Sequence, residues 1–356
     1  MKVPIFAVRV ERPANPMKIS FVIPQWNRSD LLRELLLSIS RQSMARLVDL
    51  EVIVVDNGSV DDSIDVADRA GAKVIALESN HGVSFALNRG IEAAEGEWVV
   101  LVNNDVELAP TWLSALLAKA RMTGAWFATG KTLDQTDPRK IDGAGDAICR
   151  GGASWRLGHG RADSPLFSQA RKTFFPSATA ALFRRELFDR VGLFDERFFA
   201  YLEDVDLGLR CAIAGLEGIY VPEAVAYHHG SATARAWSPR MVEWMTSHQL
   251  FLIAKFYPGR MLRQELWRIT AAQLLWAAMS ARRGQTKAWI RGAAKGLRRF
   301  RPMRRDSGNL RSNSTPLESA LAEAESEIAR IQQATGWDDY WKWYFRLTGM
   351  PPERPA

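Results

Sequence analysis

The chain contains 356 residues, of which 47% are hydrophobic and 24% are charged. This length suffices for one large domain with an appendage or for two modest domains, and the composition allows a sizeable core. The formal net charge of +7 indicates anionic partners, which include nucleic acid, acidic lipid and phosphorylated substrates. The two cysteines, Cys149 and Cys211, show no zinc-binding spacing and argue against a disulfide framework.

The first half of the chain has the pattern of an α/β protein. Residues 1–17 predict an N-terminal extension that ends in a proline-rich joint. From Lys18 onward, short apolar runs alternate with amphipathic segments, which favours a parallel sheet with helical connections. Buried strands are expected at residues 19–24, 50–56, 72–77 and 97–105. Helices are expected after the capping residues Ser29 and Asp30, and over residues 84–94.

The remainder of the chain is predicted to be mostly helical. Residues 110–175 give no clear assignment and contain glycine-rich loops around 143–160, whereas residues 236–305 have a basic, tryptophan-rich helical pattern. Residues 306–316 resemble a linker, residues 317–335 an acidic amphipathic helix, and an aromatic tail follows. These shifts predict four parts, namely an N-terminal extension, a catalytic domain, a basic helical region, and a linker with helix and tail, over residues 1–17, 18–235, 236–305 and 306–356.

Polar side chains gather where three of the expected strands end. Ligands of open α/β sheets bind in the crevice beyond the carboxyl ends of the strands, so these side chains are candidates for a binding site. They are Gln25 and Asn27 after the first strand, Asp56, Asn57 and Ser59 after the second, and Asn103, Asn104 and Asp105 after the fourth.

Two aspartates in these clusters have both a functional and a structural interpretation. Asp56 can accept hydrogen bonds from a nucleobase N–H or a ribose hydroxyl, or it can cap a helix or an Asx-turn. Asp105 can hold a divalent cation that bridges a diphosphate, since Mg²⁺ takes oxygen ligands from one or two carboxylates plus substrate phosphates. The alternative for Asp105 is a capped turn before the helix at Pro110.

A second group of polar residues lies between residues 201 and 229. Glu203, Asp204 and Asp206 place three carboxylates within four positions, and Asp204 can act as a general base if it faces the crevice. The alternative is acidic enrichment in the first turn of a helix, which the helix dipole favours. His228 and His229 follow an apolar run and are candidate metal ligands, although a histidine at a strand end is often structural.

Six segments, in chain order, resemble the family 2 glycosyltransferases, whose fold is the GT-A (Rossmann-like nucleotide-diphospho-sugar transferase) fold. The resemblance covers about residues 18–230. The segments are FVIPQWNRSD, VIVVDNGSVDDS, NHGVSFALNRGI, LVNNDVEL, PSATAALFRRELFDRVGLFDERFFAYLEDVDLGLR and VPEAVAYHHGSAT. The fourth departs from the family's Asp-x-Asp metal motif, because it reads Asn-Asn-Asp and leaves one carboxylate for the ion. That form is similar to the subgroup that contains bacterial rhamnosyltransferases.

The resemblance implies an inverting, metal-dependent glycosyltransferase. Asp204, in its pair with Glu203, would be the catalytic base, and Asp105 with His228 would hold Mg²⁺ or Mn²⁺, with His229 as the alternative histidine. A nucleotide-diphosphate sugar would be the donor, with rhamnose as the sugar that the subgroup suggests, and a lipid-linked or glycan acceptor of bacterial surface glycan assembly would receive the sugar. The donor-side residues would be Pro24, Trp26, Asn27, Asp56, Asn57, Ser59, Asn80, Asn88, Arg89, Asn103 and Asn104.

The basic region 236–305 suits a helix in an anionic lipid interface, because Arg and Lys alternate there with Trp and Leu. The sequence therefore predicts a peripheral protein on the cytoplasmic face of the inner membrane, with no spanning helix. The alternative is a solvated basic helix that packs on the catalytic domain. Nucleic acid is not expected as a partner, because no nucleic-acid module accompanies the charge.

Three other functions compete with a glycosyltransferase. A dinucleotide-dependent oxidoreductase needs a glycine-rich turn after its first strand, where this chain has Pro24-Gln25-Trp26. A sugar nucleotidyltransferase would carry a glycine-rich phosphate loop near its first strand. An inactive sugar- or lipid-binding scaffold with the same fold remains the alternative to the enzyme, and the acidic residues Asp105, Glu203 and Asp204 argue against it.

Overall fold

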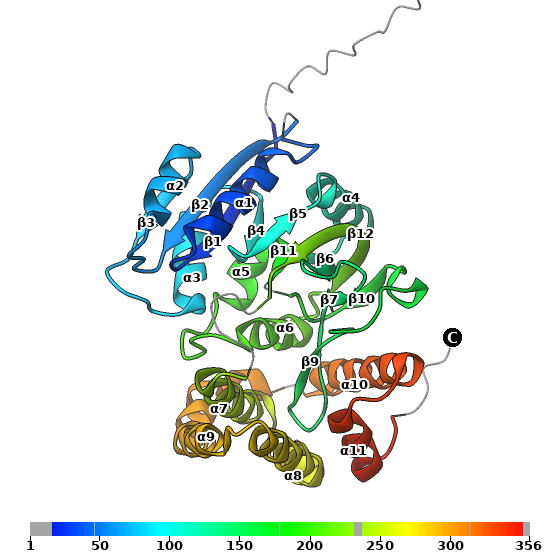
Figure 1. The fold of residues 1–356 in the computed structure, drawn as a ribbon. Helices are drawn as coiled ribbons and strands as arrows, with labels where there is room; N and C mark the ends of the chain where they lie inside the picture. The colour runs from blue at the N-terminus through cyan, green and yellow to red at the C-terminus, as the bar shows by residue number, and fades with distance from the viewer. Residues whose placement is uncertain (1–15, 46, 178, 231–236, 313, 352–356) are drawn as a thin grey trace, which may run out of the picture.

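The computed structural model describes residues 16–351 with the exception of residues 46, 178, 231–236 and 313 (Figure 1). Most of the predicted N-terminal extension, residues 1–15, therefore lies outside the described residues.

A ten-stranded mixed sheet forms the centre of the molecule. Its first part is parallel and has the strand order β3–β2–β1–β4. Parallel neighbours need crossover connections, which helices α1, α2 and α3 supply. The bounds are β1 (Lys18–Gln25), α1 (Ser29–Ser40), β2 (Asp49–Asp56), α2 (Ser63–Arg69), β3 (Lys73–Ala76), α3 (Val83–Ala93) and β4 (Trp98–Val102).

The second half of the sheet adds antiparallel pairs that the sequence pattern did not predict. Strand β11 pairs antiparallel with both β4 and β6, and β12 then runs parallel to β6. Shorter strands pair at the margins, and β8 with β9 forms a separate hairpin. The bounds are β5 (Val106–Leu108), β6 (Phe127–Asp134), β7 (Ile141–Gly143), β8 (Asp146–Ile148), β9 (Ser154–Arg156), β10 (Arg171–Thr173), β11 (Ala180–Arg184) and β12 (Gly218–His228).

Helices cover both faces of the sheet, and each face has its own apolar core. Side chains of α1, α2 and α4 (Trp112–Thr123) pack on one face, including Leu35 and Trp112. Side chains of α3, α5 (Glu186–Val191) and α6 (Glu203–Ile213) pack on the other face. Since both faces are covered, the central strands are near-continuous apolar runs, as parallel strands require.

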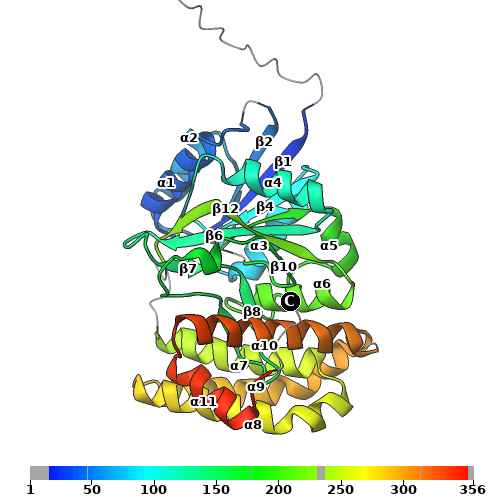
Figure 2. The same cartoon turned by 90° about the vertical axis from the view of Figure 1, so that its right-hand side faces the viewer.

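The C-terminal third forms a helical layer beneath the sheet, as Figure 2 shows. Ser238 caps α7 by accepting a hydrogen bond from the Met241 amide, and Pro239 occupies its first turn. Gly292 lets helix α9 pack closely on α7, since a Cβ at this position would lie 2.5 Å from the carbonyl oxygen of Glu243. The bounds are α7 (Pro239–Phe256), α8 (Gly259–Arg282), α9 (Thr286–Asp306), α10 (Thr315–Thr335) and α11 (Asp339–Thr348), with short 3₁₀ turns at Pro165–Phe167 and Gly308–Arg311.

The α/β fold class and the four strands expected before residue 106 are confirmed, each within three residues of the predicted ends. The helix expected after Ser29 begins there, but the residue at its cap position is Arg28, in a left-handed conformation without a side-chain cap. The division of the chain into four parts stays a prediction. One apolar core joins α6 and the β8–β9 hairpin to α7, α8, α10 and α11, so the helical layer packs directly against the elements beside the sheet.

A buried ion pair docks the C-terminal helices onto the hairpin. The carboxylate of Glu325, on α10, is 2.5 Å from the guanidinium of Arg150 and accepts a hydrogen bond of 2.7 Å from the hydroxyl of Tyr344, on α11. The same hydroxyl accepts a hydrogen bond of 3.1 Å from the Gly151 amide. Glu325 is 1% exposed, so these partners replace the hydrogen bonds that water would give its carboxylate.

We therefore expect Glu325→Ala to lower the free energy of unfolding by about 3–5 kcal/mol, because it leaves the Arg150 guanidinium without its partner. Urea denaturation measures this. The matched control is Glu318→Ala, which removes an exposed carboxylate of the same helix and should change the free energy by less than about 0.5 kcal/mol. Equal effects of the two substitutions would contradict the docking role of Glu325.

Candidate functional site

Asp56 ends β2 at the carboxyl edge of the parallel sheet, where the sequence placed a nucleotide contact. It is 1% exposed, and its Oδ2 accepts a hydrogen bond of 3.0 Å from the Ser59 amide. Its Oδ1 is enclosed and has no hydrogen-bond partner among the described residues. A buried carboxylate oxygen without a partner is costly. It therefore suits a ligand that donates an N–H or O–H.

The polar residues around Asp56 are hydrogen-bonded to one another and shape its loops. Ser59 accepts a hydrogen bond of 2.8 Å from the Asn27 amide, and Asn27 accepts one of 2.9 Å from the Val60 amide. Asn57 donates to the Asn80 side chain at 3.2 Å and to the Gly82 carbonyl at 3.0 Å. The structure thus brings Asn27, Asn57, Ser59 and Asn80 together around Asp56, as the loops that enclose it.

A hydrogen bond between two side-chain amides connects the ends of β1 and β4. The side chain of Asn104 donates a hydrogen bond of 2.6 Å to Gln25, whose own amide donates to the Asn27 carbonyl at 2.6 Å. The Asn103 amide donates to the Thr179 carbonyl at 3.0 Å. These contacts fix the loop between Val102 and Asp105. Pro24, Trp26 and Asn103 are half-buried on the same edge of the sheet.

Asn88 and Arg89 lie on α3 and contact the segment around residue 195. The Asn88 side chain is 3% exposed; it donates to the carbonyl of Phe194 at 3.0 Å and accepts from the Phe194 amide at 2.9 Å. Arg89 pairs with Glu92 at 3.0 Å. These contacts give Asn88 a structural role, and the donor contacts of Asn88 and Arg89 stay predictions.

Asp105 and His228, the two predicted metal ligands, lie side by side. Asp105 follows β4 and His228 ends β12, and their Oδ1 and Nε2 atoms are 3.2 Å apart. The other ring nitrogen of His228 is 2.8 Å from the carboxylate of Asp142, on β7. His229 contributes only its backbone amide, which donates to the Asp105 carbonyl at 3.0 Å, while its ring faces Glu34.

The electrostatic surroundings of Asp105, His228 and Asp142 favour a charged imidazole between two ionised carboxylates. Burial lowers the pKa of His228, but the contacts with Asp105 and Asp142 outweigh burial and raise it to about 9. Burial opposes ionisation of Asp105 as well, yet hydrogen bonding and attraction to His228 hold its pKa below the ordinary value. Burial opposes ionisation of Asp142 too, but Arg156, His159 and His228 together lower its pKa.

The Glu203–Asp204 pair begins α6 and interacts with a further carboxylate on the hairpin. Glu203 is 7% exposed, and burial followed by the charge of Asp204 raises its pKa, which favours the neutral acid. Burial and the same Asp204 charge raise the pKa of Asp146, on β8. Arg156 faces Asp146 across the hairpin, and Asp142, Asp146 and Asp204 raise its pKa against the effect of burial. Asp204 thus shares its surroundings with two weak acids and one cation.

Asp142, Asp146 and Arg156 were missed by sequence reasoning. They lie in the glycine-rich stretch 143–160 or at its border, in strands of three residues. Such strands are too short to show a period of two. The available signal was the two aspartates of IDGAGD followed by Arg150 and Arg156. Asp206, by contrast, is fully buried and pairs with Arg210 at 3.0 Å, so it is structural.

The residues present fit a divalent cation at Asp105 and His228. A carboxylate and an imidazole would face the ion, and the metal would replace the proton on Nε2 of His228, since a protonated nitrogen cannot bind a cation. Asp142 holds the second imidazole nitrogen, as carboxylates do behind many metal-binding histidines. Among the described residues no group of three or more His, Cys, Asp or Glu side chains converges on one point. Two protein ligands leave most of the coordination sphere to diphosphate oxygens and water, which is usual for Mg²⁺.

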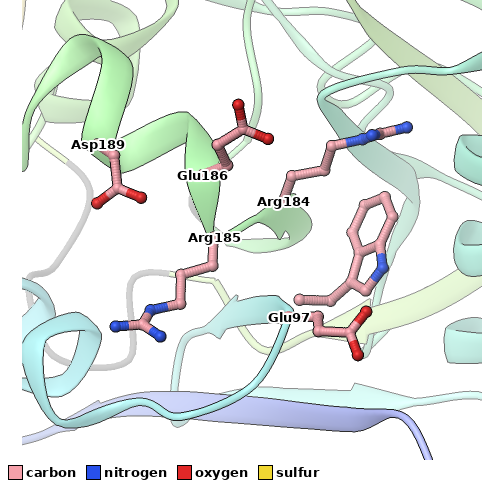
Figure 3. Close-up of a pocket in the computed structure, with 6 residues that line it drawn as sticks. Glu97, Arg184, Arg185, Glu186 and Asp189 are labelled. Carbon is pink, nitrogen blue, oxygen red and sulfur yellow. The ribbon is translucent and has the colours of Figure 1, made fainter.

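A hollow of about 420 Å³ lies at the opposite edge of the sheet and is separate from these residues. Trp98 begins β4 and Arg184 ends the antiparallel β11, so both lie away from the strand ends that carry Asp56 and Asp105. The Arg184 guanidinium is 5.3 Å from the ring centre of Trp98. The lining residues, drawn in Figure 3, are Glu97, Trp98, Arg184, Arg185, Glu186 and Asp189.

Comparison with solved structures supports the fold. The chain matches a structure of GalNAc-T7 with UDP, GalNAc and Mn²⁺ with a TM-score of 0.57 and 15% identity, over 81% of this chain and 56% of that one. It matches the mannosyltransferase PcManGT from Pyrobaculum calidifontis, in complex with GDP-Man and Mn²⁺, with a TM-score of 0.52 and 19% identity, over 94% and 85%. The expected GT-A fold, with a helical C-terminal region, is confirmed.

Several curated proteins have similar sequences. An uncharacterised protein y4gI of Sinorhizobium fredii is 34% identical over 60% of this chain and 25% of its own length. The O-antigen biosynthesis protein RfbC of Myxococcus xanthus is 31% identical over 62% and 18%. The chain therefore spans a quarter or less of these two relatives. An N-acetylglucosaminyl-diphospho-decaprenol L-rhamnosyltransferase of Mycobacterium tuberculosis is 31% identical over 59% of this chain and 76% of that protein.

Family comparison agrees with these relatives. Residues 20–192 match the family described as glycosyl transferase family 2, and residues 151–305 match glycosyl transferase family group 2. The two matches together include Asp56, Asp105, Asp204 and His228. Together with the 31% identity across three quarters of the mycobacterial rhamnosyltransferase, they show that this chain belongs to glycosyltransferase family 2.

Proposed function

We propose that this protein transfers a sugar from a nucleotide-diphosphate donor to an acceptor hydroxyl, with inversion at the anomeric carbon. The observation that carries the proposal is that the carboxylate–imidazole pair Asp105–His228 and the acidic pair Glu203–Asp204 lie around the same cation. That cation is Arg156, whose pKa is raised both by Asp142, the partner of His228, and by Asp204. Tyr201 lies within electrostatic reach of both pairs, because after burial the charges of Glu203, Arg156 and Asp105 act on its pKa.

In the proposed reaction the chain's own residues bind, orient and accept a proton. Asp56 receives a hydrogen bond from the base or ribose through its unpartnered Oδ1. Asp105 and His228 would hold Mg²⁺ or Mn²⁺, which when bound neutralises charge on the leaving diphosphate. Asp204 takes the proton from the acceptor hydroxyl as its oxygen forms a bond to the anomeric carbon. The bond from that carbon to the diphosphate oxygen breaks in the same displacement, so the nucleoside diphosphate leaves and the configuration inverts.

The division of labour between the two acids follows from their surroundings. Glu203 is enclosed and its Oε2 has no hydrogen-bond partner among the described residues, which favours its protonated form. A neutral acid at Glu203 places no like charge beside Asp204, which suits Asp204 as the group that accepts the proton.

Bacterial surface glycan assembly is the proposed setting, and rhamnose is the proposed sugar. The similarity to the rhamnosyltransferase and to the O-antigen protein supports this. Those relatives suggest a lipid-linked or glycan acceptor. An inactive scaffold of the same fold would bind the donor without turning it over.

A lipid surface is the proposed site of action. Fewer tryptophans of the region 236–305 are exposed to contact lipid than the sequence suggested. Of the five tryptophans expected at the interface, Trp267 is exposed, whereas Trp237 stacks on the buried Trp276 at 5.3 Å and Trp244 stacks on Phe199. None of the described helices is long and apolar enough to cross a bilayer.

Helix α9 offers the better lipid-facing surface. Ile290 and Leu297 are 53% and 66% exposed and share one helical face, seven residues apart. The helix carries eight basic residues and one acid, which gives it the charge to attract anionic headgroups. Exposed apolar residues amid basic ones are typical of helices that lie in a membrane interface.

For the reaction, we expect Asp204→Asn to reduce turnover by roughly 10²- to 10⁴-fold, because the amide cannot accept the acceptor proton. Glu203→Gln should cost at least about tenfold less, since an amide resembles the neutral acid in size and polarity. Release of nucleoside diphosphate from the donor, with a bacterial lipid extract as acceptor, measures both. The control is Asp189→Asn, an exposed carboxylate on α5. A larger loss for Glu203→Gln than for Asp204→Asn would reverse the assignment.

For the membrane, we expect Leu297→Ala to weaken binding to phosphatidylglycerol vesicles by roughly 10- to 50-fold, since the substitution removes three carbons and roughly 0.8 kcal/mol is lost per methylene that inserts. Co-sedimentation at low salt measures this. The matched control is Leu37→Ala, because Leu37 is 49% exposed on α1, away from the helical layer. Equal binding of the two variants to phosphatidylglycerol vesicles would reject α9 as the lipid-facing helix. Binding of the wild type to neutral phosphatidylcholine vesicles as strong as to phosphatidylglycerol vesicles would reject the role of its basic residues.

A further inference from the structure

We infer that α7 is part of the catalytic unit, with His248 as a positioning residue that holds the segment 195–202 and so sets the place of the Glu203–Asp204 pair. This inference rests on the proposed function, in which Asp204 is the base. It assigns to the helical layer a role in the reaction that is separate from any contact with lipid.

The backbone just before the acidic pair is strained. Tyr201 and Leu202 have φ angles of 69° and 68°, so two consecutive residues that are not glycine lie in the left-handed region. Such conformations persist where the surrounding structure holds them, and they concentrate at functional sites. The Leu202 carbonyl accepts a hydrogen bond of 2.9 Å from the Asp206 amide. The direction in which Glu203 and Asp204 leave the chain thus depends on these two residues.

His248 holds the strained backbone from the helical side. It is fully buried on α7, and its Nδ1 lies 2.9 Å from the Tyr201 carbonyl oxygen. Because a carbonyl only accepts, Nδ1 carries the proton. Burial lowers the pKa of His248 to about 4, so the imidazole is neutral at physiological pH. Its ring packs against Phe198 and Phe251 at 5.0 and 5.4 Å.

Two further side chains of α7 hold the same segment. Trp244 stacks on Phe199 with ring centres 5.1 Å apart. The Lys255 ammonium lies 2.7 Å from Asp195, at the start of the segment, and 2.6 Å from Asp206, in the first turn of α6. Lys255 is 4% exposed. A buried lysine between two carboxylates therefore ties the start of the segment and the first turn of α6 to α7.

The donor side of the protein holds the segment from the opposite direction. The Val83 amide donates a hydrogen bond of 2.7 Å to the Phe199 carbonyl, and the Ser84 hydroxyl donates to the Phe198 carbonyl. A Cβ at Gly82 would lie 2.5 Å from the Phe199 oxygen. Asn57, beside Asp56, bonds the Gly82 carbonyl. The segment is thus clamped between the nucleotide-side loops and α7, which fixes the base relative to the donor.

The test compares two substitutions of His248. His248→Leu removes the donor to Tyr201, whereas His248→Asn keeps an N–H near the position of Nδ1. We expect His248→Leu to lower kcat for nucleoside diphosphate release roughly 10- to 100-fold, since small misplacements of catalytic groups have effects of that order. The dissociation constant of the Mn²⁺–nucleotide should change less than about twofold, and His248→Asn should regain most of kcat. Arg240→Leu, an exposed position of α7, is the control.

Hydrogen–deuterium exchange of residues 196–206 supplies a readout that needs no activity. His248→Leu should speed exchange there and not in the strands β1 and β2, whereas His248→Asn should stay near the wild type. Wild-type kcat together with wild-type exchange in His248→Leu would overturn the inference. A wild-type protein that neither binds nucleotide nor releases diphosphate would instead reject the proposed function, while the exchange data would still decide the contact.

Discussion

The position of His228 between Asp105 and Asp142 is the contact on which the arrangement of the site depends. It joins the end of β4, the short strand β7 and the end of β12, at distances of 3.2 and 2.8 Å. Acidic side chains of the sheet edge and the hairpin would repel one another if they were left without cations. The imidazole, together with the Arg156 guanidinium, keeps two of these carboxylates ionised while Glu203 and Asp146 stay weak acids.

The helical layer and the sheet are packed together around this site. Helix α6 contributes to the core of the sheet through Leu207 and to the core shared with the helical layer through Leu209. The segment before it is fixed by α3 on one side and by α7 on the other. A change in the helical layer therefore reaches the Glu203–Asp204 pair through packed side chains, which is why we treat α7 as belonging to the catalytic part of the chain.

Much of the fold could be predicted because buried parallel strands are continuous apolar runs and their polar ends are easy to see. The juxtaposition of Asp105 and His228, some 120 residues apart, came from family resemblance and not from any local pattern. The hairpin with Asp146 and Arg156 could not be predicted, since strands of three residues show no periodicity. Composition alone also could not tell that Trp237 and Trp276 stack on each other, because a tryptophan-rich helix can present those rings to lipid or to protein.

Binding of UDP, dTDP and GDP, each with and without Mn²⁺, tests the central claim most directly when the wild type is compared with Asp56→Asn and, as a control, Asp65→Asn. The account predicts that one nucleotide raises the melting temperature of the wild type in the presence of Mn²⁺, since a ligand at 100 times its dissociation constant stabilises by about 2.7 kcal/mol. Asp56→Asn should lose most of that shift, whereas Asp65, 68% exposed on α2, should be dispensable. The absence of any shift in the wild type, or an equal shift in Asp56→Asn, would contradict it.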